Sequence, residues 1–336
     1  MQVSDMNTKK SLILSLILTC CPVLVCAEQL AIAVVGDAQR VASVEKTLLT
    51  PFSEATGIDI RVIEVAHQDG ADAAALLQRA DSEKWDFLTL NEDQALRACS
   101  TGDLTQTGIK QPRKNSLLPA LSAPATCHSF TEFRANTMVY NLDAYRRDIP
   151  NHISAFFDLE RFPGKRAITT DAIGLLELAL MGYGVPASQV YHILSATRGV
   201  ALAASVFGPL KDNIIWATSN SDTERLLSTG AATMGLLDLD AIVETGAATN
   251  SGGAQPMPLN RLSANASLVR QTSWVKIKSS ASASDVTAQF VTFAQSSGFD
   301  KPQITAGIYE DAQWYDRVTP DIKSRLANWR DALRKE

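Results

Sequence analysis

The chain has 336 residues, of which 46% are apolar and 20% charged, and its formal net charge at pH 7 is −5. This balance provides enough apolar material for a core and excludes a disordered polar chain, a collagen-like repeat and a disulfide-dense miniprotein. The length suggests about two domains, and the acidic balance without a cluster of Lys and Arg argues against a nucleic-acid partner.

Residues 1–27 are typical of a secretory signal peptide. Lys9 and Lys10 precede an apolar run, Ser11–Cys26, which ends in residues suited to cleavage. A membrane anchor is the alternative, but the run is shorter than the ~20 apolar residues that span a bilayer and contains Pro22. The mature chain is therefore expected to be soluble and periplasmic.

Two cysteines, Cys99 and Cys127, remain after the signal peptide. In an exported chain they most simply form one disulfide, and the alternative is two unrelated buried thiols. The four histidines are scattered and form no zinc-binding pattern, so no metal is expected.

The first part of the mature chain alternates between short apolar strands and amphipathic helices. Strands are predicted where apolar residues run together or alternate, and helices where they recur every three or four positions. The predicted elements are a strand at Leu30–Val35, a helix at Val41–Thr56, a strand at Ile58–Val65, a helix at Ala71–Ala80 and a strand at Trp85–Leu90. This order is typical of a parallel sheet covered by helices.

The remaining chain begins with a long connection over 99–127 that is rich in Gly, Pro, Ser and Thr. Further strands are predicted at Thr137–Tyr140, Asn213–Ala217, Ala232–Leu237 and Leu268–Ile277, with a Gly-rich loop at Gly246–Pro258. Helices are predicted at Ala172–Met181, Ser188–Arg198, Asp222–Ser228, Ser284–Gln295 and from Pro320 to the end, and Pro150–Lys165 contains a helix start and a turn. No repeat and no low-complexity linker is present, which favours lobes joined by short crossovers.

Motifs of common catalytic sites are absent from the sequence. There is no GxSxG elbow, no HExxH, no P-loop and no GxGxxG after the first strand. The acidic pairs Glu92-Asp93 and Glu310-Asp311 are most often found on solvated faces. The chain is therefore expected to be neither an enzyme nor a cofactor-binding protein.

Acidic and aromatic residues follow several of the predicted strands. Asp37, Asp93 and Asp238 each follow a strand, and Trp216 ends a strand before a polar loop that contains Ser219. Loops at the carboxyl ends of parallel strands line a ligand crevice, where carboxylates and rings would suit a cation. Taken singly, each has a structural alternative, because a strand Trp is usually core and an Asp after a strand is usually a helix cap.

Several stretches of the chain resemble the periplasmic solute-binding proteins of ABC importers, in particular the spermidine/putrescine-binding branch. The matching stretches are Pro51–Ile58 (PFSEATGI), Thr137–Asn141 (TMVYN), Phe156–Arg166 (FFDLERFPGKR) and Trp216–Gly230 (WATSNSDTERLLSTG). Together with Cys99, Cys127 and Trp274, they span nearly all of the mature chain, about residues 28–312. The pair of cysteines resembles the disulfide-bearing members of that branch.

The resemblance implies an α/β fold of the two-lobe, type II-like periplasmic binding-protein class, with crossover strands and a central cleft. The first lobe would comprise 28–137 plus 266–308, and the second 138–265 plus 309–336. A small, cationic, polyamine-like solute would be captured between the lobes and delivered to an inner-membrane ABC permease by a monomer. The ligand contacts carried over are Gly36, Asp37, Asp93, Asn136, Thr137, Trp216, Ser219, Asp238, Trp274 and Tyr309. The alternative is a paralogue that no longer binds a ligand and acts as a periplasmic sensor or partner-binding protein.

Overall fold

The computed structural model describes residues 29–66, 73–104, 127–170, 172–240, 259–261, 267–280, 282–297, 308–311, 314 and 317–335. The signal peptide predicted over 1–27, the loop predicted at Gly246–Pro258 and most of the connection over 99–127 lie outside these residues. Within them, no single helix has the length and apolar character needed to cross a membrane. The helical segments Ala187–Leu194 and Thr197–Asn213 reach this length and apolar character only when they are counted together, and the angle between them is 118°.

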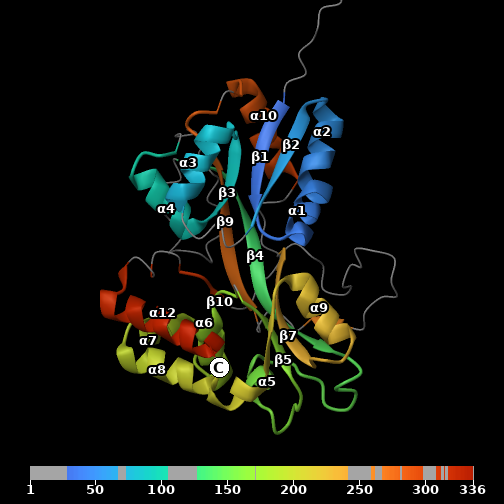
Figure 1. Ribbon diagram of the computed structural model, residues 1–336, viewed down its shortest axis with the longest axis vertical. Helices are drawn as coiled ribbons and strands as arrows, with labels where there is room; N and C mark the ends of the chain where they lie inside the picture. The colour runs from blue at the N-terminus through green and yellow to red at the C-terminus, as the bar shows by residue number, and fades with distance from the viewer. Residues whose placement is uncertain are drawn as a thin grey trace, which may run out of the picture.

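The first lobe is built on three parallel strands with β1 in the middle. The strands are β1 (Gln29–Val35), β2 (Asp59–Val65) and β3 (Phe87–Asn91). The helices around them are α1 (Ala38–Val44), η1 (Glu45–Leu49), α2 (Thr50–Thr56), α3 (Ala73–Glu83), α4 (Glu92–Ser100) and α10 (Ser284–Ser296) (Figure 1). The helix predicted at Val41–Thr56 forms, but its middle part, η1, is a stretch of π-helix. Pro51 follows in the first turn of α2 and has no backbone N–H to donate to the preceding turn.

The second lobe has its own parallel strands and most of the remaining helices. Its strands are β5 (Arg166–Thr169), β6 (Ile214–Ala217) and β7 (Met234–Asp240), with β5 parallel to both others. Its helices are α5 (Ser154–Phe157), α6 (Leu175–Tyr183), η3 (Ala187–Gln189), α7 (Val190–Leu194), α8 (Thr197–Val206), η4 (Gly208–Asn213), α9 (Asn220–Ser228) and α12 (Pro320–Lys335). The single helix predicted at Ser188–Arg198 is wrong, because Ala196 is extended and the chain starts a new helix at Thr197.

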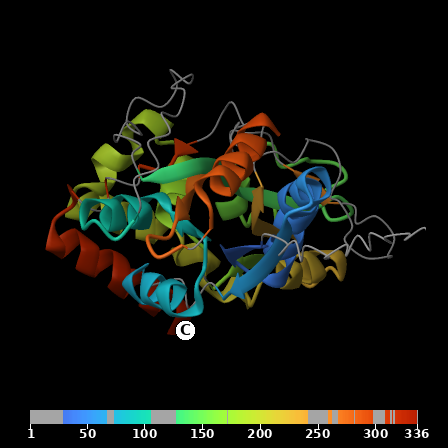
Figure 2. The same cartoon turned by 90° about the horizontal axis from the view of Figure 1, so that it is seen from above.

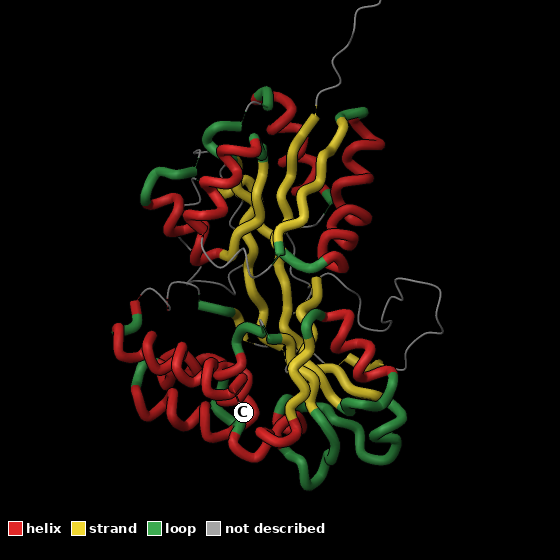
Figure 3. Tube along the Cα trace, viewed as in Figure 1, coloured by secondary structure: helices red, strands yellow, loops and turns green. Residues whose placement is uncertain are grey.

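Two long strands, β4 (His128–Asn141) and β9 (Ser267–Lys276), run from one lobe to the other (Figures 1 and 3). They pair antiparallel with each other, β9 pairs antiparallel with β3, and β4 pairs antiparallel with β7. The result is one mixed sheet in the order β2-β1-β3-β9-β4-β7-β5-β6, with β10 (Ile308–Tyr309) on β9 and β8 (Leu259–Arg261) on β4. The sheet is therefore parallel only within each lobe, and Thr137–Tyr140 is one end of a strand of 14 residues.

Each lobe has a hydrophobic core of its own, and helices lie on both sides of the strands (Figure 2). In the first lobe, Phe52 packs edge-on against Phe290 with ring centroids 5.2 Å apart. In the second lobe, Phe207 packs against Trp329 of α12 with centroids 5.3 Å apart, which places the C-terminal helix on that core. The two-lobe α/β fold is confirmed. The residue boundaries given above for the lobes stay a prediction, because β4 and β9 contribute to both.

The predicted disulfide forms between Cys99 and Cys127, whose Cα atoms are 5.7 Å apart. Cys99 lies in the last turn of α4 and Cys127 immediately precedes β4. The bridge therefore fixes the entry of the long strand β4 to the first lobe, beside the fully buried Trp85.

Candidate functional site

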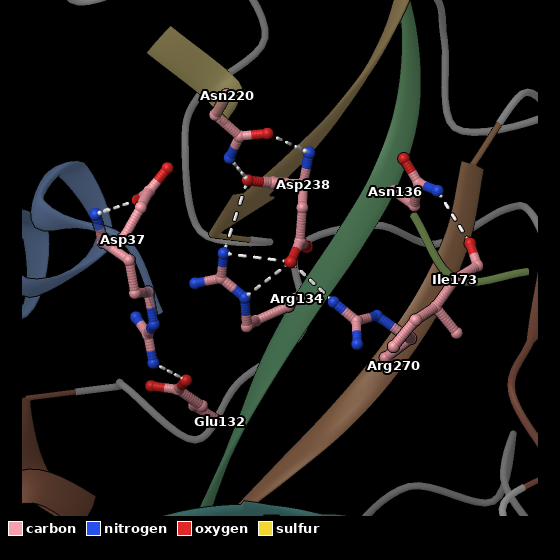
Figure 4. A network of polar contacts seen from close by, with 9 residues as sticks. Asp37, Glu132, Arg134, Asn136, Ile173, Asn220, Asp238 and Arg270 are labelled. Carbon is pink, nitrogen blue, oxygen red and sulfur yellow. Dashed lines mark hydrogen bonds and ion pairs between the residues drawn. The ribbon is translucent and has the colours of Figure 1, made fainter. Parts of the chain in front are cut away.

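Three charged side chains meet at the junction of the lobes: Arg134 of β4, Asp238 of β7 and Arg270 of β9 (Figure 4). In the strand register, Asn136 of β4 lies opposite Asp238 of β7, and Arg134 of β4 lies opposite Arg270 of β9. Like charges placed directly opposite each other destabilise a sheet. The carboxylate of Asp238 lies between the two guanidinium groups and compensates for their repulsion.

Asp238 forms ion pairs with both arginines through one oxygen. Its Oδ2 lies 2.5 Å from Arg270 Nη2, 3.2 Å from Arg134 Nη2 and 3.3 Å from Arg134 Nε. The arginine side chains are 6% and 10% exposed, and that of Asp238 is 27% exposed. The three charges leave one net positive charge in a largely buried position.

Two polar atoms of this group have no hydrogen-bond partner. Within the described residues, Oδ1 of Asp238 and Nε of Arg270 are both buried and unpaired. Buried polar groups in folded proteins are nearly always paired, so such atoms mark a place where a ligand or water can bind. Arg270 thus has an unused donor and Asp238 an unused acceptor, on two side chains that contact each other.

Helix α9 holds the end of β7 in position. Asn220 Nδ2 donates to the carbonyl oxygen of Asp238 at 2.6 Å, and the Asp238 N–H donates to Asn220 Oδ1 at 3.2 Å. Ser219 is the N-cap of α9 and accepts from the Asp222 N–H at 3.1 Å, so its hydroxyl serves the helix start.

Neighbouring residues on β4 hold the strands of the junction together. Asn136 Nδ2 donates to the Ile173 carbonyl oxygen at 2.7 Å, just before α6. The buried hydroxyl groups of Thr137 and Ser267 bond to each other between β4 and β9. Both predicted residues thus lie at the junction of the lobes, and their side chains serve the scaffold.

The pKa values of two carboxyl groups near the junction, those of Asp238 and Glu310, are shifted in opposite directions. Burial tends to raise the pKa of Asp238, but the two adjacent guanidinium groups outweigh it and hold that pKa well below its usual range. Burial raises the pKa of Glu310 to about 8, assisted by the carboxylates of Glu177, Asp93 and Asp238 and opposed by Arg270. At pH 7 Asp238 is therefore charged, and the carboxyl of Glu310 is mostly neutral and can donate a hydrogen bond.

The turn after β1 faces Arg40 of its own lobe. Gly36 has φ +154°, and a Cβ atom there would lie 2.4 Å from Arg40 Cγ. Asp37 caps α1 by accepting from the Arg40 N–H at 2.9 Å, and the Arg40 guanidinium pairs with the buried carboxylate of Glu132 (Figure 4). The side chain of Arg40 therefore requires a glycine at position 36.

The remaining predicted site residues are dispersed. Trp274 is fully buried in the first-lobe core and donates from Nε1 to Glu132 Oε2 at 3.2 Å, whereas Trp216 is half-buried against the second-lobe core. Asp93 pairs with Arg97 at 2.6 Å and acts electrostatically on Glu310. Tyr309 pairs through its backbone with β9, and its side chain lies outside the described part of the chain. Ligand contact by these residues stays a prediction.

Sequence reasoning missed Arg134, Arg270, Asn220 and Glu310. A signal existed, because Arg134 lies between the apolar residues Phe133 and Ala135, and Arg270 follows the apolar pair Leu268-Val269. Arginines are rarely buried unless paired, so a charge within such an alternating strand indicates a buried partner. Carboxylates and rings are the groups that suit the expected cation, and arginines are not among them. No group of three or more His, Cys, Asp or Glu side chains in the described part of the chain could hold a metal ion.

Comparison with known proteins adds a family match and fold neighbours. The model of the family described as "Bacterial extracellular solute-binding protein" matches residues 47–301. The gamma-aminobutyric acid-binding protein of Pseudomonas aeruginosa is 27% identical over 213 residues, which cover 62% of this chain and 58% of that protein. The match thus spans under two thirds of that relative's length.

Solved structures of binding proteins share the fold. An ABC transporter substrate-binding protein from Bradyrhizobium japonicum superposes with a TM-score of 0.66 at 18% identity, covering 92% of this chain and 100% of that one. The spermidine/putrescine ABC transporter substrate-binding protein PotD from Streptococcus pneumoniae superposes with a TM-score of 0.58 at 14% identity, covering 91% of this chain and 100% of that one. At such identities the likeness concerns the fold alone.

Proposed function

The chain belongs to the family of bacterial extracellular solute-binding proteins, and from this premise we propose that it is the substrate-binding component of an ABC transport system for a small zwitterion of the ω-amino acid type. Captured between the lobes in the periplasm, the solute is handed to an inner-membrane permease without chemical change. The observation that supports the solute class is the single net positive charge of Arg134, Arg270 and Asp238, with Arg270 Nε unpaired.

A carboxylate fits this charge best. One carboxylate oxygen can accept from Arg270 Nε, and charge-assisted hydrogen bonds of this kind are stronger than neutral ones. The carboxylates of Glu177 and Asp93, which act electrostatically on Glu310, are the candidate partners of the ammonium end of the solute, although Asp93 also pairs with Arg97. The name of the Pseudomonas aeruginosa relative, a gamma-aminobutyric acid-binding protein, supports the same class.

A polyamine-like ligand receives less support from the geometry. Such a cation needs a carboxylate whose charge is not already compensated, but the charge of Asp238 is shared by two guanidinium groups and only its Oδ1 is unpaired. A diamine at this point would also meet the net positive charge of the two arginines. We therefore propose a solute that carries at least one carboxylate.

Three four-carbon compounds test the proposal, because they differ only in their end groups: gamma-aminobutyrate, putrescine and succinate. Thermal unfolding and calorimetric titration should show that gamma-aminobutyrate binds best. At 100 times its dissociation constant, it should stabilise the fold by about 2.7 kcal/mol. A larger shift with putrescine would support the polyamine class, and no shift with any small solute would support the paralogue that has lost binding.

Substitution locates the site. Arg270→Gln removes the unpaired donor while Asp238 keeps Arg134, so the fold should persist. Loss of a hydrogen bond between charged groups costs about 1.5–3 kcal/mol, so the dissociation constant should rise at least about tenfold. Arg146→Gln, in an exposed pair with Asp143, is the matched control and should bind as the parent does. Equal affinity of both variants would contradict the assignment.

A further inference from the structure

A side-chain contact joins the two lobes at the edge of the site. Gln39 of α1 donates from Nε2 to Oε1 of Glu224 at 3.2 Å and accepts at Oε1 from the Ser221 hydroxyl at 3.0 Å. Ser221 and Glu224 lie three residues apart on α9 and therefore share one face of that helix. Both ends of one amide are thus bonded to the opposite lobe.

The same turn of α9 also holds the candidate site. Asn220, which precedes Ser221, bonds to the backbone of Asp238 in both directions. The first turn of α9 therefore contacts the ion-pair group through Asn220 and the first lobe through Ser221. A movement of α9 away from α1 would break the Gln39 contacts while Asn220 kept its hold on β7.

We propose that Gln39 is an interlobe latch, whose bonds to α9 exist in the closed arrangement of the lobes and set how much of the protein is closed. β4 and β9 run from lobe to lobe, so a hinge motion about them would separate α1 from α9 (Figure 1). The expected effect of the latch on ligand affinity rests on the proposed function. A solute held between the lobes binds the closed form, so its apparent affinity depends on the fraction of the protein that is closed.

The charge on the Glu224 side makes the latch testable by exchange. Gln39→Glu places a second carboxylate beside Glu224 and removes the donor, so it should open the lobes. In the double variant, Gln39→Glu with Glu224→Gln, the new glutamine at position 224 can donate to the new carboxylate at position 39, and Ser221 can still donate to position 39. The double variant should therefore close the lobes again. Glu224→Gln alone keeps an acceptor for Gln39 and should remain closed. Gln78→Glu, at an exposed position of α3, makes the same charge change away from the contact.

The measurement is the distance between spin labels on α2 and on α12, together with the radius of gyration from X-ray scattering, in the full mature chain without solute. Gln39→Glu should show a longer mean distance than the parent and Gln78→Glu, and the double variant should return to the parent value. Unchanged distances in Gln39→Glu, or no recovery in the double variant, would overturn the proposal.

A second readout links the latch to binding. With gamma-aminobutyrate as the probe, Gln39→Glu should raise the dissociation constant about tenfold, mainly through faster release, and the double variant should recover. Opening without any gamma-aminobutyrate binding in the parent chain would support the latch and refute the solute class. Parent-like affinity in an opened Gln39→Glu variant would refute the link between closure and affinity.

Discussion

The replacement Asp238→Asn should destabilise the protein, because it removes the counter-ion that two opposed arginines share. Asp238 Oδ2 takes part in three contacts with Arg134 and Arg270 at 2.5–3.3 Å. Hydrogen bonds to charged groups contribute about 1.5–3 kcal/mol each, against about 0.5–1.5 for neutral ones, and an asparagine retains a neutral acceptor. Because the Asp238 side chain is 27% exposed, solvent weakens the effect. The free energy of unfolding should fall by about 2–3 kcal/mol.

Urea unfolding followed by tryptophan fluorescence measures this change, and the melting temperature should fall by about 3–5 °C. Asp143→Asn is the control, because Asp143 pairs with Arg146 on the surface with its side chain 62% exposed, and its loss should cost under about 0.5 kcal/mol. If Asp238→Asn and Asp143→Asn unfold at the same urea concentration, Asp238 is not the shared counter-ion.

The pH dependence of the Asp238→Asn effect has a definite sign. The two arginines lower the pKa of Asp238 in the folded chain below its unfolded value, so its stabilising contribution is complete above about pH 4 and is lost as the pH falls further. The difference in unfolding free energy between parent and Asp238→Asn should stay constant from pH 5 to 8 and shrink below pH 4. A difference that persists unchanged at pH 2.5 would refute the electrostatic origin.

Two further predictions concern the same scaffold. The pKa of Glu310 is raised to about 8, so between about pH 4.5 and 8 this carboxyl group is ionised in the unfolded chain and protonated in the folded chain. The free energy of unfolding should therefore fall by up to about 1.4 kcal/mol per pH unit in that range. Urea denaturation at pH 5 to 8 should show a flatter dependence on pH for Glu310→Gln than for the parent, and equal slopes would contradict this. The Cys99–Cys127 bridge joins residues 28 apart, so Cys99→Ser with Cys127→Ser should lower the unfolding free energy by about 3–4 kcal/mol, and an unchanged urea midpoint would contradict this.

The parts of the fold that depend on local pattern could be predicted from the sequence. The run Leu30–Val35 forms β1, which is buried on both faces, and the alternation Ile58–Val65 forms the partly exposed β2. Both are local apolar patterns that can be seen in the sequence. The helix α4 was missed, since Glu92–Ser100 is short and begins with acidic residues that resemble a solvated loop. The first residues of β4 were missed because their charges are paired by residues far away in the chain.

The candidate site is difficult to predict from the sequence because its charges are paired by residues far away in the chain. Asp238 lies at the junction of the lobes, but it is paired with two arginines and is not the free carboxylate expected for a cation; its contact with a ligand stays a prediction. Its two partners, Arg134 and Arg270, are 104 and 32 residues away and are brought to it by the register of β4, β7 and β9. Sequence spacing does not show that register, so the sign of the charge at the site could not be predicted.

One face of β4 connects the first lobe, the candidate site and the second lobe in successive steps. Glu132, Arg134 and Asn136 alternate with apolar residues and therefore point to the same side of the strand. Glu132 pairs with Arg40 of the first lobe, Arg134 with Asp238, and Asn136 with the Ile173 carbonyl of the second lobe. A twist of β4 that moves the lobes must therefore also move the Arg134 guanidinium relative to the contacts that Glu132 and Asn136 make on either side of it. Ligand binding at Arg134, as proposed above, would therefore be coupled to lobe movement through this one strand.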